Sequence, residues 1–266
     1  MYSHVQLALK YISYWIKASN GRGHGIHSPF VYDFVVKVLE DSRKERKKYR
    51  HIEKVRQNFS NSSEMISILD LGAGSAHGNA ASRSVSSLVK NAAKPSKFGR
   101  LFHRLVKHYE IESVLELGTS LGISTRYFAD ALPEGQVFTI EGAPALASYA
   151  QSNFAKEGYQ NIEMKEGDFS MVVPQLLPVL KGKKLIYVDG NHRYAPTVDY
   201  FHQMRSYSGE YDILIFDDIH WSQEMEKAWE EIKNHQQVRC TIDVFFIGIV
   251  FFRKEFKEKC NFSIRF

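Results

Sequence analysis

Acidic residues stand at the ends of several short apolar runs in the second half of the chain. The runs SVLELG, QVFTIEG, KLIYVDG and YDILIFDD carry Glu116, Glu141, Asp189 and the adjacent Asp217 and Asp218. An ionised carboxylate only accepts hydrogen bonds, so it can receive those of sugar hydroxyls. In open sheets of parallel strands, ligands bind outside the carboxyl ends of the strands. These acids therefore predict a ligand site at one edge of a parallel sheet.

Two glycine-rich stretches compete for the role of a nucleotide-binding loop. An adenosine cofactor requires a strand before the loop, a helix after it, and an acid about 20 residues further on. The stretch VLELGTSLGIST (residues 114–125) meets this test, because SVLEL precedes Gly118, a helical pattern follows Gly122, and Glu141 ends the next run. We therefore expect the cofactor at this loop.

The other stretch, ILDLGAGSAHGN (residues 68–79), fails the same test. No acid occurs between residues 72 and 107, and AASRSVSSLVKNAAKPSKF contains no convincing second strand. A glycine-rich turn without these partners is weak evidence. We interpret the turn at residues 72–75 as part of an N-terminal cap, where Ser75 or His77 could touch substrate.

The elements that position these residues follow a regular order from residue 98 onward. Five short β-rich runs alternate with helical patterns, which predicts a parallel sheet covered on both faces. The closing segment VRCTIDVFFIGIVFFRK holds two β-runs with too little chain between them for a crossover helix, so it predicts an antiparallel hairpin. Residues 1–20 read as an amphipathic helix. We expect an N-terminal helical cap at 1–97 and an α/β domain at 98–266.

With ELGTSLG, TIEG, EGDF and IYVDGNH in this order, residues 98–253 resemble the class I S-adenosylmethionine-dependent methyltransferases. The resemblance implies a Rossmann-like, mostly parallel seven-stranded sheet, whose terminal hairpin places the seventh strand between the fifth and sixth. It also implies S-adenosylmethionine as cofactor. The cofactor-binding residues that it implies are Glu116, Gly118, Thr119, Ser120, Gly122, Glu141, Gly142, Asp168, Phe169 and Asp189. The glycines could instead be turn residues, and Asp168 could cap the helix that begins near Ser170.

The residues after the fourth and fifth strands resemble those of metal-dependent O-methyltransferases of the catechol, caffeoyl-CoA and macrocin types. In that fold these strand ends are adjacent, and three converging carboxylates would repel one another unless a cation lay among them. The resemblance implies Asp189, Asp217 and Asp218 as ligands of Mg²⁺ or another divalent cation, with His192 as the catalytic base beside Asp189. Alternatively, Asp217 or Asp218 caps the helix near Ser222, and His192 is structural.

Metal-assisted O-methylation of a small hydroxylated substrate is the leading hypothesis. Two alternatives stay open: an RNA or protein methyltransferase that uses the basic segment at residues 42–56, and a catalytically inactive binding protein with the same fold. A formal net charge of +5 requires no nucleic-acid partner. No Asn-Pro-Pro-Tyr-like signature follows the fourth strand, which counts against nitrogen targets. The segment HGIHSPF (residues 24–30) is either a lid or a linker between helices.

Cysteine usage and hydropathy indicate a cytoplasmic protein. The two cysteines, Cys240 and Cys260, have no C-x-x-C spacing and suggest no disulfide framework. The longest apolar run, VFFIGIVFF, has nine residues, whereas a membrane-spanning helix needs about 20. We expect no membrane span, and a homodimer is compatible with the sequence.

Overall fold

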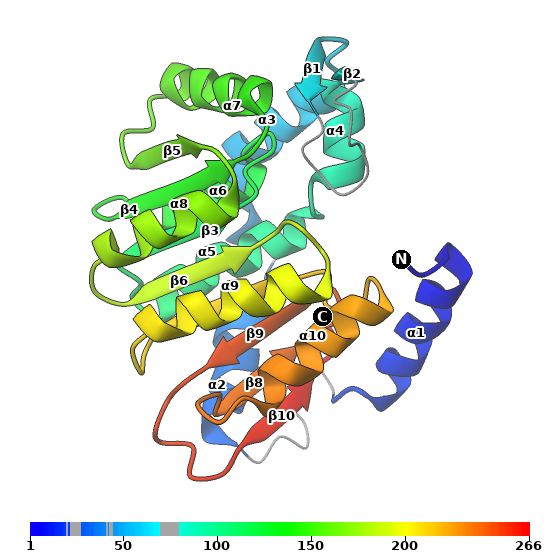
Figure 1. Ribbon diagram of the computed structural model, residues 1–266, viewed down its shortest axis with the longest axis vertical. Helices are drawn as coiled ribbons and strands as arrows, with labels where there is room; N and C mark the ends of the chain where they lie inside the picture. Colours follow the sequence, from blue (N-terminus) through cyan, green and yellow to red (C-terminus); the bar gives the residue numbers. More distant parts are fainter. Residues whose placement is uncertain (20, 22–27, 41, 43–44, 70–79) are drawn as a thin grey trace. The chain divides into compact units, whose positions relative to one another are not determined.

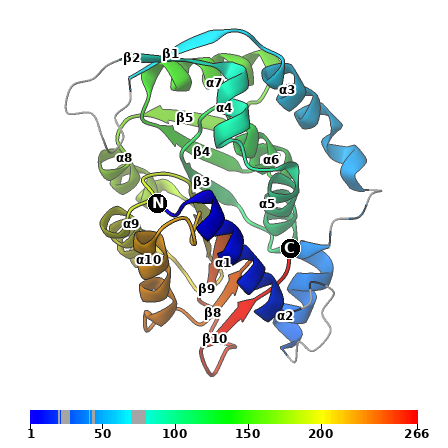
Figure 2. The same ribbon diagram turned by 90° about the vertical axis from the view of Figure 1, so that its right-hand side faces the viewer.

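The computed structural model describes residues 1–19, 21, 28–40, 42, 45–69 and 80–266. These residues form two compact units. Unit 1 comprises Met1–Glu40 and Lys183–Phe266, and unit 2 comprises Asp41–Gly182. Figures 1 and 2 show the helices and strands of the chain in two views. The boundary at residue 97, which rests on sequence pattern, stays a prediction.

Unit 2 contains three parallel strands in the order β3 (Ser113–Leu117), β4 (Gln136–Glu141) and β5 (Ile162–Glu166). Every residue of β3 is buried, as expected for a strand of a parallel sheet that is covered on both faces. The helices that precede, connect and follow these strands are α5 (Ser96–His108), α6 (Ile123–Ala131), α7 (Pro144–Glu157), α8 (Phe169–Leu176) and the 3₁₀ turn η3 (Leu177–Val179). Strand, loop and helix therefore alternate as predicted.

The N-terminal part of unit 2 packs against the start of this α/β segment. It consists of η2 (Glu45–Tyr49), α3 (Arg50–Ser60), β1 (Met65–Leu69), β2 (Ala80–Ser84) and α4 (Val85–Ala92). Ile52 of α3 and Leu88 of α4 belong to one buried cluster with Leu121, which lies in the second glycine loop. The cap thus buries the apolar side of that loop.

Strand β2 corrects one expectation. The segment AASRS was predicted to contain no strand, yet it pairs antiparallel with β1, with Met65 opposite Ser84. Short polar residues gave no alternating pattern, so only the pairing with β1 reveals the strand. A cofactor loop of this kind connects to a parallel second strand, whereas β2 is antiparallel to β1. The prediction that the cofactor binds at residues 114–125 is therefore unaffected. Residues 70–79 lie outside the described residues.

Unit 1 contains the strands β6 (Lys184–Val188), β7 (Ile213–Asp217), β8 (Cys240–Asp243), β9 (Ile247–Phe251) and β10 (Cys260–Ser263). Their order is β10-β8-β9-β7-β6. Strands β6 and β7 are parallel, while β9 is antiparallel to both β7 and β8. The predicted terminal hairpin is therefore confirmed, with its last strand inserted as expected. Strand β10, parallel to β8 at the edge, was not predicted.

The described helices of unit 1 flank these strands. They are α1 (His4–Lys17), α2 (Pro29–Phe34), the π-helical turn η1 (Val35–Leu39), α9 (Tyr194–Tyr207) and α10 (Gln223–Asn234). The predicted helix at residues 1–20 is confirmed as α1, which lies beside β8 and β10 in Figure 2. The Tyr14 hydroxyl of α1 donates to the carbonyl of Ile264, the residue that follows β10. None of the helices in the described ranges is long and apolar enough to cross a bilayer.

Candidate functional site

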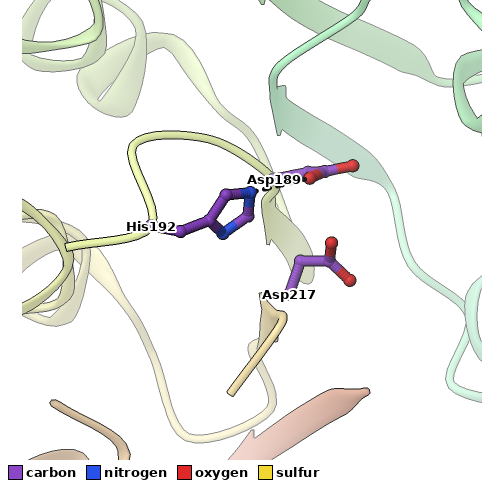
Figure 3. Close-up of side chains that lie close together, drawn as sticks. All are labelled: Asp189, His192 and Asp217. Atoms are coloured by element: carbon purple, nitrogen blue, oxygen red, sulfur yellow. Dashed lines mark ion pairs between the residues drawn. The ribbon is translucent and has the colours of Figure 1, made fainter. Parts of the chain in front are cut away.

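Asp189, His192 and Asp217 come together at the carboxyl ends of two parallel strands in unit 1. Val188 of β6 pairs with Phe216 of β7, so the residues that follow, Asp189 and Asp217, emerge side by side. His192 folds back from the loop after β6 toward both acids (Figure 3). One ligand atom of each residue lies within 4.8 Å of the others, and His192 Nε2 is 3.6 Å from Asp189 Oδ1. The predicted juxtaposition of these strand ends is thus present.

The three side chains differ in their exposure. Asp217 is 1% exposed, whereas the side chains of Asp189 and His192 are 24% and 28% exposed. The buried Tyr187 donates a hydrogen bond from its hydroxyl to Asp189 Oδ2 at 3.0 Å. This bond fixes one oxygen of Asp189 and leaves the other facing His192.

The donor set fits a divalent cation. Ligand oxygens on opposite sides of Mg²⁺ lie about 4 Å apart, since each is about 2.1 Å from the metal. The observed separations of no more than 4.8 Å are close to that value. Two carboxylates at this separation also repel each other unless a positive charge compensates them.

Asp218 does not belong to this cluster among the described residues. Its backbone is left-handed, with φ 52°, its N–H donates to the Phe246 carbonyl at 2.7 Å, and its carbonyl accepts from the Trp221 N–H at 2.9 Å. These contacts place the residue in the turn after β7. Its role as a metal ligand stays a prediction.

The alternative that Asp217 or Asp218 caps the next helix is wrong. The N-cap of α10 is Ser222, whose hydroxyl accepts from the Met225 N–H at 3.2 Å. The neighbouring His220 is bound elsewhere, since its Nε2 lies 2.8 Å from Asp243 Oδ2. His220 therefore fastens the turn to β8.

The second glycine loop, in unit 2, has the backbone shape of a tight ligand loop. Gly118, Ser120 and Gly122 have φ values of 100°, 50° and 71°, the left-handed region that favours glycine. The N–H groups of Gly118 and Thr119 both donate to the Ile140 carbonyl, at 3.0 and 3.2 Å. The loop is thereby held against the end of β4.

Helix α6 begins directly after this loop without a side-chain cap. Its N-cap is Gly122, which has no side chain that could accept a hydrogen bond from the first turn. The free N–H groups of a helix N-terminus and the helix dipole favour an anionic ligand group. The loop and helix start therefore fit a carboxylate or phosphate.

Glu141 ends β4 beside the same loop. Its Oε2 accepts from the Ser120 N–H at 2.8 Å and its Oε1 from the Ala143 N–H at 3.0 Å. Each carboxylate oxygen has a further lone pair, so the group can still accept two hydroxyls. Its geometry fits the predicted ribose contact, which stays a prediction.

Glu116 lies inside the protein rather than at a surface. It is fully buried, and the hydroxyls of Ser124, Thr125 and Thr139 donate to its carboxylate at 2.5, 2.5 and 2.7 Å. Burial raises the pKa of the Glu116 carboxyl to about 7, and these hydrogen bonds moderate the rise. In this structure Glu116 joins β3, β4 and α6; its predicted cofactor contact stays a prediction.

The three hydroxyl donors to Glu116 were missed by the sequence reasoning. Ser124 and Thr125 lie in the first turn of α6, and Thr139 lies on β4, where its hydroxyl is also 2.6 Å from that of Thr119. Polar residues within otherwise buried runs were the available signal. Thr119, predicted to contact the cofactor, is itself buried in this group.

The remaining predicted cofactor residues lie after β4 and β5. Asp168 is the N-cap of α8, since its Oδ1 accepts from the Ser170 N–H at 2.8 Å. The alternative that Asp168 caps this helix is therefore confirmed, and Phe169 is the first residue of α8. Gly142 is loosely surrounded, because an added Cβ would meet only the Gly167 carbonyl at 3.8 Å. Adenine contacts by these residues stay predictions.

Two further sequence predictions concern residues that the structure describes incompletely. Of the segment 24–30, only Ser28, Pro29 and Phe30 are described, where Ser28 caps α2. Ser75 and His77 lie outside the described residues.

A family comparison matches the central part of the chain. Residues 115–219 match the sequence model of a family described as a methyltransferase domain. Every predicted cofactor, catalytic and metal residue lies within this segment. The predicted resemblance to methyltransferases is confirmed.

Two curated relatives are O-methyltransferases. The chain is 28% identical over 124 residues to a catechol O-methyltransferase of Niastella koreensis, which covers 46% of this chain and 55% of that protein. It is 35% identical over 86 residues to a protein-L-isoaspartate O-methyltransferase of Aeropyrum pernix. This match covers 32% of this chain and 33% of that protein. The chain thus spans about half the length, or less, of these relatives.

A solved structure shares the fold. The O-methyltransferase TomG of Streptomyces achromogenes, in complex with S-adenosylmethionine, matches with a TM-score of 0.52 and 22% identity, covering 61% of this chain and 82% of that one. The likeness confirms the Rossmann-like, mostly parallel methyltransferase fold.

Proposed function

We propose that this chain is an S-adenosylmethionine-dependent O-methyltransferase that methylates a hydroxyl group of a small molecule with the help of a divalent cation. The observation that carries the proposal is the meeting of Asp189, His192 and Asp217 at adjacent strand ends. The methyltransferase family match over residues 115–219 and the catechol O-methyltransferase relative support it.

The loop of unit 2 would bind the methyl donor. The uncapped start of α6 would receive the carboxylate of the methionine moiety. Glu141, held by the N–H groups of Ser120 and Ala143, would accept the ribose hydroxyls. The donor supplies a methyl group on a sulfonium, which is electrophilic without further activation.

The acids of unit 1 would hold the cation. Asp189 and Asp217 are the carboxylates of the cluster, and Asp218 is the predicted third. A divalent cation bound there lowers the pKa of a hydroxyl and fixes its position. The burial of Asp217 limits the water around the cluster, which strengthens its electrostatic interactions.

We assign His192 as the general base. In the reaction a substrate oxygen bonds to the methyl carbon, the carbon–sulfur bond breaks and returns its electron pair to sulfur, and the hydroxyl proton must leave. His192 is partly exposed beside Asp189, and a neutral imidazole can act as a general base. Asp189, fixed by Tyr187, would orient the ring.

A protein carboxyl group is the second candidate substrate. The match to a protein-L-isoaspartate O-methyltransferase favours it. A carboxylate is already ionised at pH 7, so it needs neither a base nor a cation to become a nucleophile. Dependence on metal and on His192 therefore separates the two candidates.

The test uses the purified chain with a methyl donor that carries a radiolabelled methyl group. Catechol and an isoaspartyl peptide are offered separately, each with Mg²⁺ or with a chelator. We expect transfer to catechol that requires Mg²⁺. Transfer to the peptide that survives chelation would replace the proposal by the second candidate, and failure of calorimetry to detect donor binding would exclude both.

Site variants separate the roles within the cluster. Asp217→Asn is expected to remove most of the turnover while donor affinity stays near that of the parent. His192→Ala is expected to lower turnover by about 10²- to 10⁴-fold without weakening Mn²⁺ binding. Loss of Mn²⁺ binding in His192→Ala would make His192 a ligand instead of a base. Asp199→Asn, which removes an exposed charge of α9, is the matched control.

A further inference from the structure

The two cysteines of the chain face each other across neighbouring strands. Cys260, the first residue of β10, pairs with Cys240, the first residue of β8. Adjacent strands lie about 4.8 Å apart, and a disulfide requires Cα atoms about 4.4 to 6.8 Å apart. The spacing of the two Cα atoms expected from this register therefore lies within the range of a disulfide.

Both thiols lie on the same side of the sheet. In directly paired strands, residues that oppose each other project to one face, and the next pair projects to the other. The next pair is Thr241 and Asn261, whose side chains meet at 2.6 Å between Thr241 Oγ1 and Asn261 Oδ1. The opposite face therefore belongs to the two cysteines.

We propose that Cys240 and Cys260 form a thiol–disulfide site that reacts with low-molecular-weight disulfides and closes reversibly to an internal disulfide bond. The site lies outside the acidic cluster and the glycine loop, and it is independent of the proposed methyl transfer.

The two thiols have different parts in the reaction because their surroundings differ. Cys240 is fully buried, whereas Cys260 is half-buried on the edge strand. The interaction with the Cys240 thiol lowers the pKa of the Cys260 thiol, while the same interaction and burial raise the pKa of the Cys240 thiol. Cys260 is therefore the attacking group.

The reaction balances in two exchanges. The Cys260 thiolate attacks one sulfur of the small disulfide, forms a mixed disulfide and releases one small thiol. Cys240 then gives up its proton and attacks the Cys260 sulfur, which forms the Cys240–Cys260 bond and releases the second small thiol. The protein pair loses two electrons and two protons, and the small disulfide gains them.

The bond would fasten the edge strand that holds the end of α1. The Ser19 N–H donates to the Ser263 carbonyl at 2.8 Å, and the Arg265 N–H donates to the Ser19 carbonyl at 3.1 Å. Tyr14 of α1 also donates to the Ile264 carbonyl. Tying β10 to β8 therefore restrains the end of α1, and oxidation is expected to raise the unfolding temperature and slow amide exchange in β10.

The test treats the folded full-length chain with glutathione disulfide and follows it by intact mass and thiol titration. We expect the parent chain to lose two thiols, keep no glutathione and yield a peptide linked through Cys240 and Cys260. Dithiothreitol should restore both thiols.

Single variants test the order of attack. Cys240→Ser is expected to stop at one stably bound glutathione on Cys260, whereas Cys260→Ser is expected to remain unmodified. A parent chain that keeps both thiols, or that accumulates a glutathione adduct without an internal bond, would overturn the proposal. So would disulfide-linked dimers as the main product.

Discussion

The buried carboxyl of Glu116 makes the stability of the protein depend on pH, and Glu116→Gln is expected to remove that dependence. Burial raises the pKa of this carboxyl from 4.5 to about 7 in the folded chain. Between these values the folded state binds more protons than the unfolded state. Stability contributed by the neutral carboxyl is therefore fully present below about pH 4.5 and is lost as the pH rises toward 7.

The size of the effect follows from the shift in pKa. Each pKa unit corresponds to about 1.4 kcal/mol, so a shift of this size amounts to about 3 kcal/mol. Glutamine cannot ionise, and the hydroxyls of Ser124, Thr125 and Thr139 can both donate and accept, so they can pair with an amide. Part of the loss already occurs below pH 5, so relative to the parent the variant should gain about 2.5 kcal/mol between pH 5 and pH 8.

Urea unfolding followed by far-ultraviolet circular dichroism at pH 5 and pH 8 measures this change. The difference in unfolding free energy between Glu116→Gln and the parent is taken at each pH. Subtracting the value at pH 5 from the value at pH 8 cancels any packing cost of the amide that does not depend on pH. Glu134→Gln, at an exposed site in the same unit, controls for the loss of a carboxyl. A difference between Glu116→Gln and the parent that stays constant from pH 5 to pH 8 would refute the reasoning.

Two other predictions concern the packing of the glycine loop and are measured by the same unfolding assay. Arg126 is fully buried and pairs with Glu157 at 2.6 Å, so Glu157→Gln should cost about 2 to 3 kcal/mol by leaving a buried cation; an unchanged stability would show that the pair is dispensable. At Gly122, with φ 71°, an added Cβ would lie 2.2 Å from Phe154, so Gly122→Ala should cost about 2 to 4 kcal/mol. Gly158 has a similar φ of 82° but open space around an added Cβ, so Gly158→Ala measures the cost of the backbone conformation alone. Equal losses of stability in the two variants would show that the clash with Phe154 contributes nothing.

The elements of the α/β segment could be predicted because their signals are local. Buried strands read as apolar runs, and the hairpin of β8 and β9 followed from the short connection between them. Strands β2 and β10 could not be predicted in this way. Each is short, and each owes its extended form to a partner strand, β1 or β8, whose identity no local pattern reveals.

The candidate site was predictable in part. The acids at the strand ends and the resemblance pointed to Asp189, Asp217 and His192, and the structure brings these three together. The environment of Glu116 was not predictable, because the hydroxyls that surround it come from β4 and α6, and burial depends on how those elements pack.

The sequence by itself determined the succession of strand, glycine loop and helix, and it placed an acid at the end of most strands. Only the tertiary structure decided which of these side chains meet. The register of β6 against β7 sets Asp189 beside Asp217, and the register of β10 against β8 sets Cys260 opposite Cys240. Shifting a strand by one residue would turn its side chains to the other face, so contacts between distant residues depend on a pairing that local patterns do not encode.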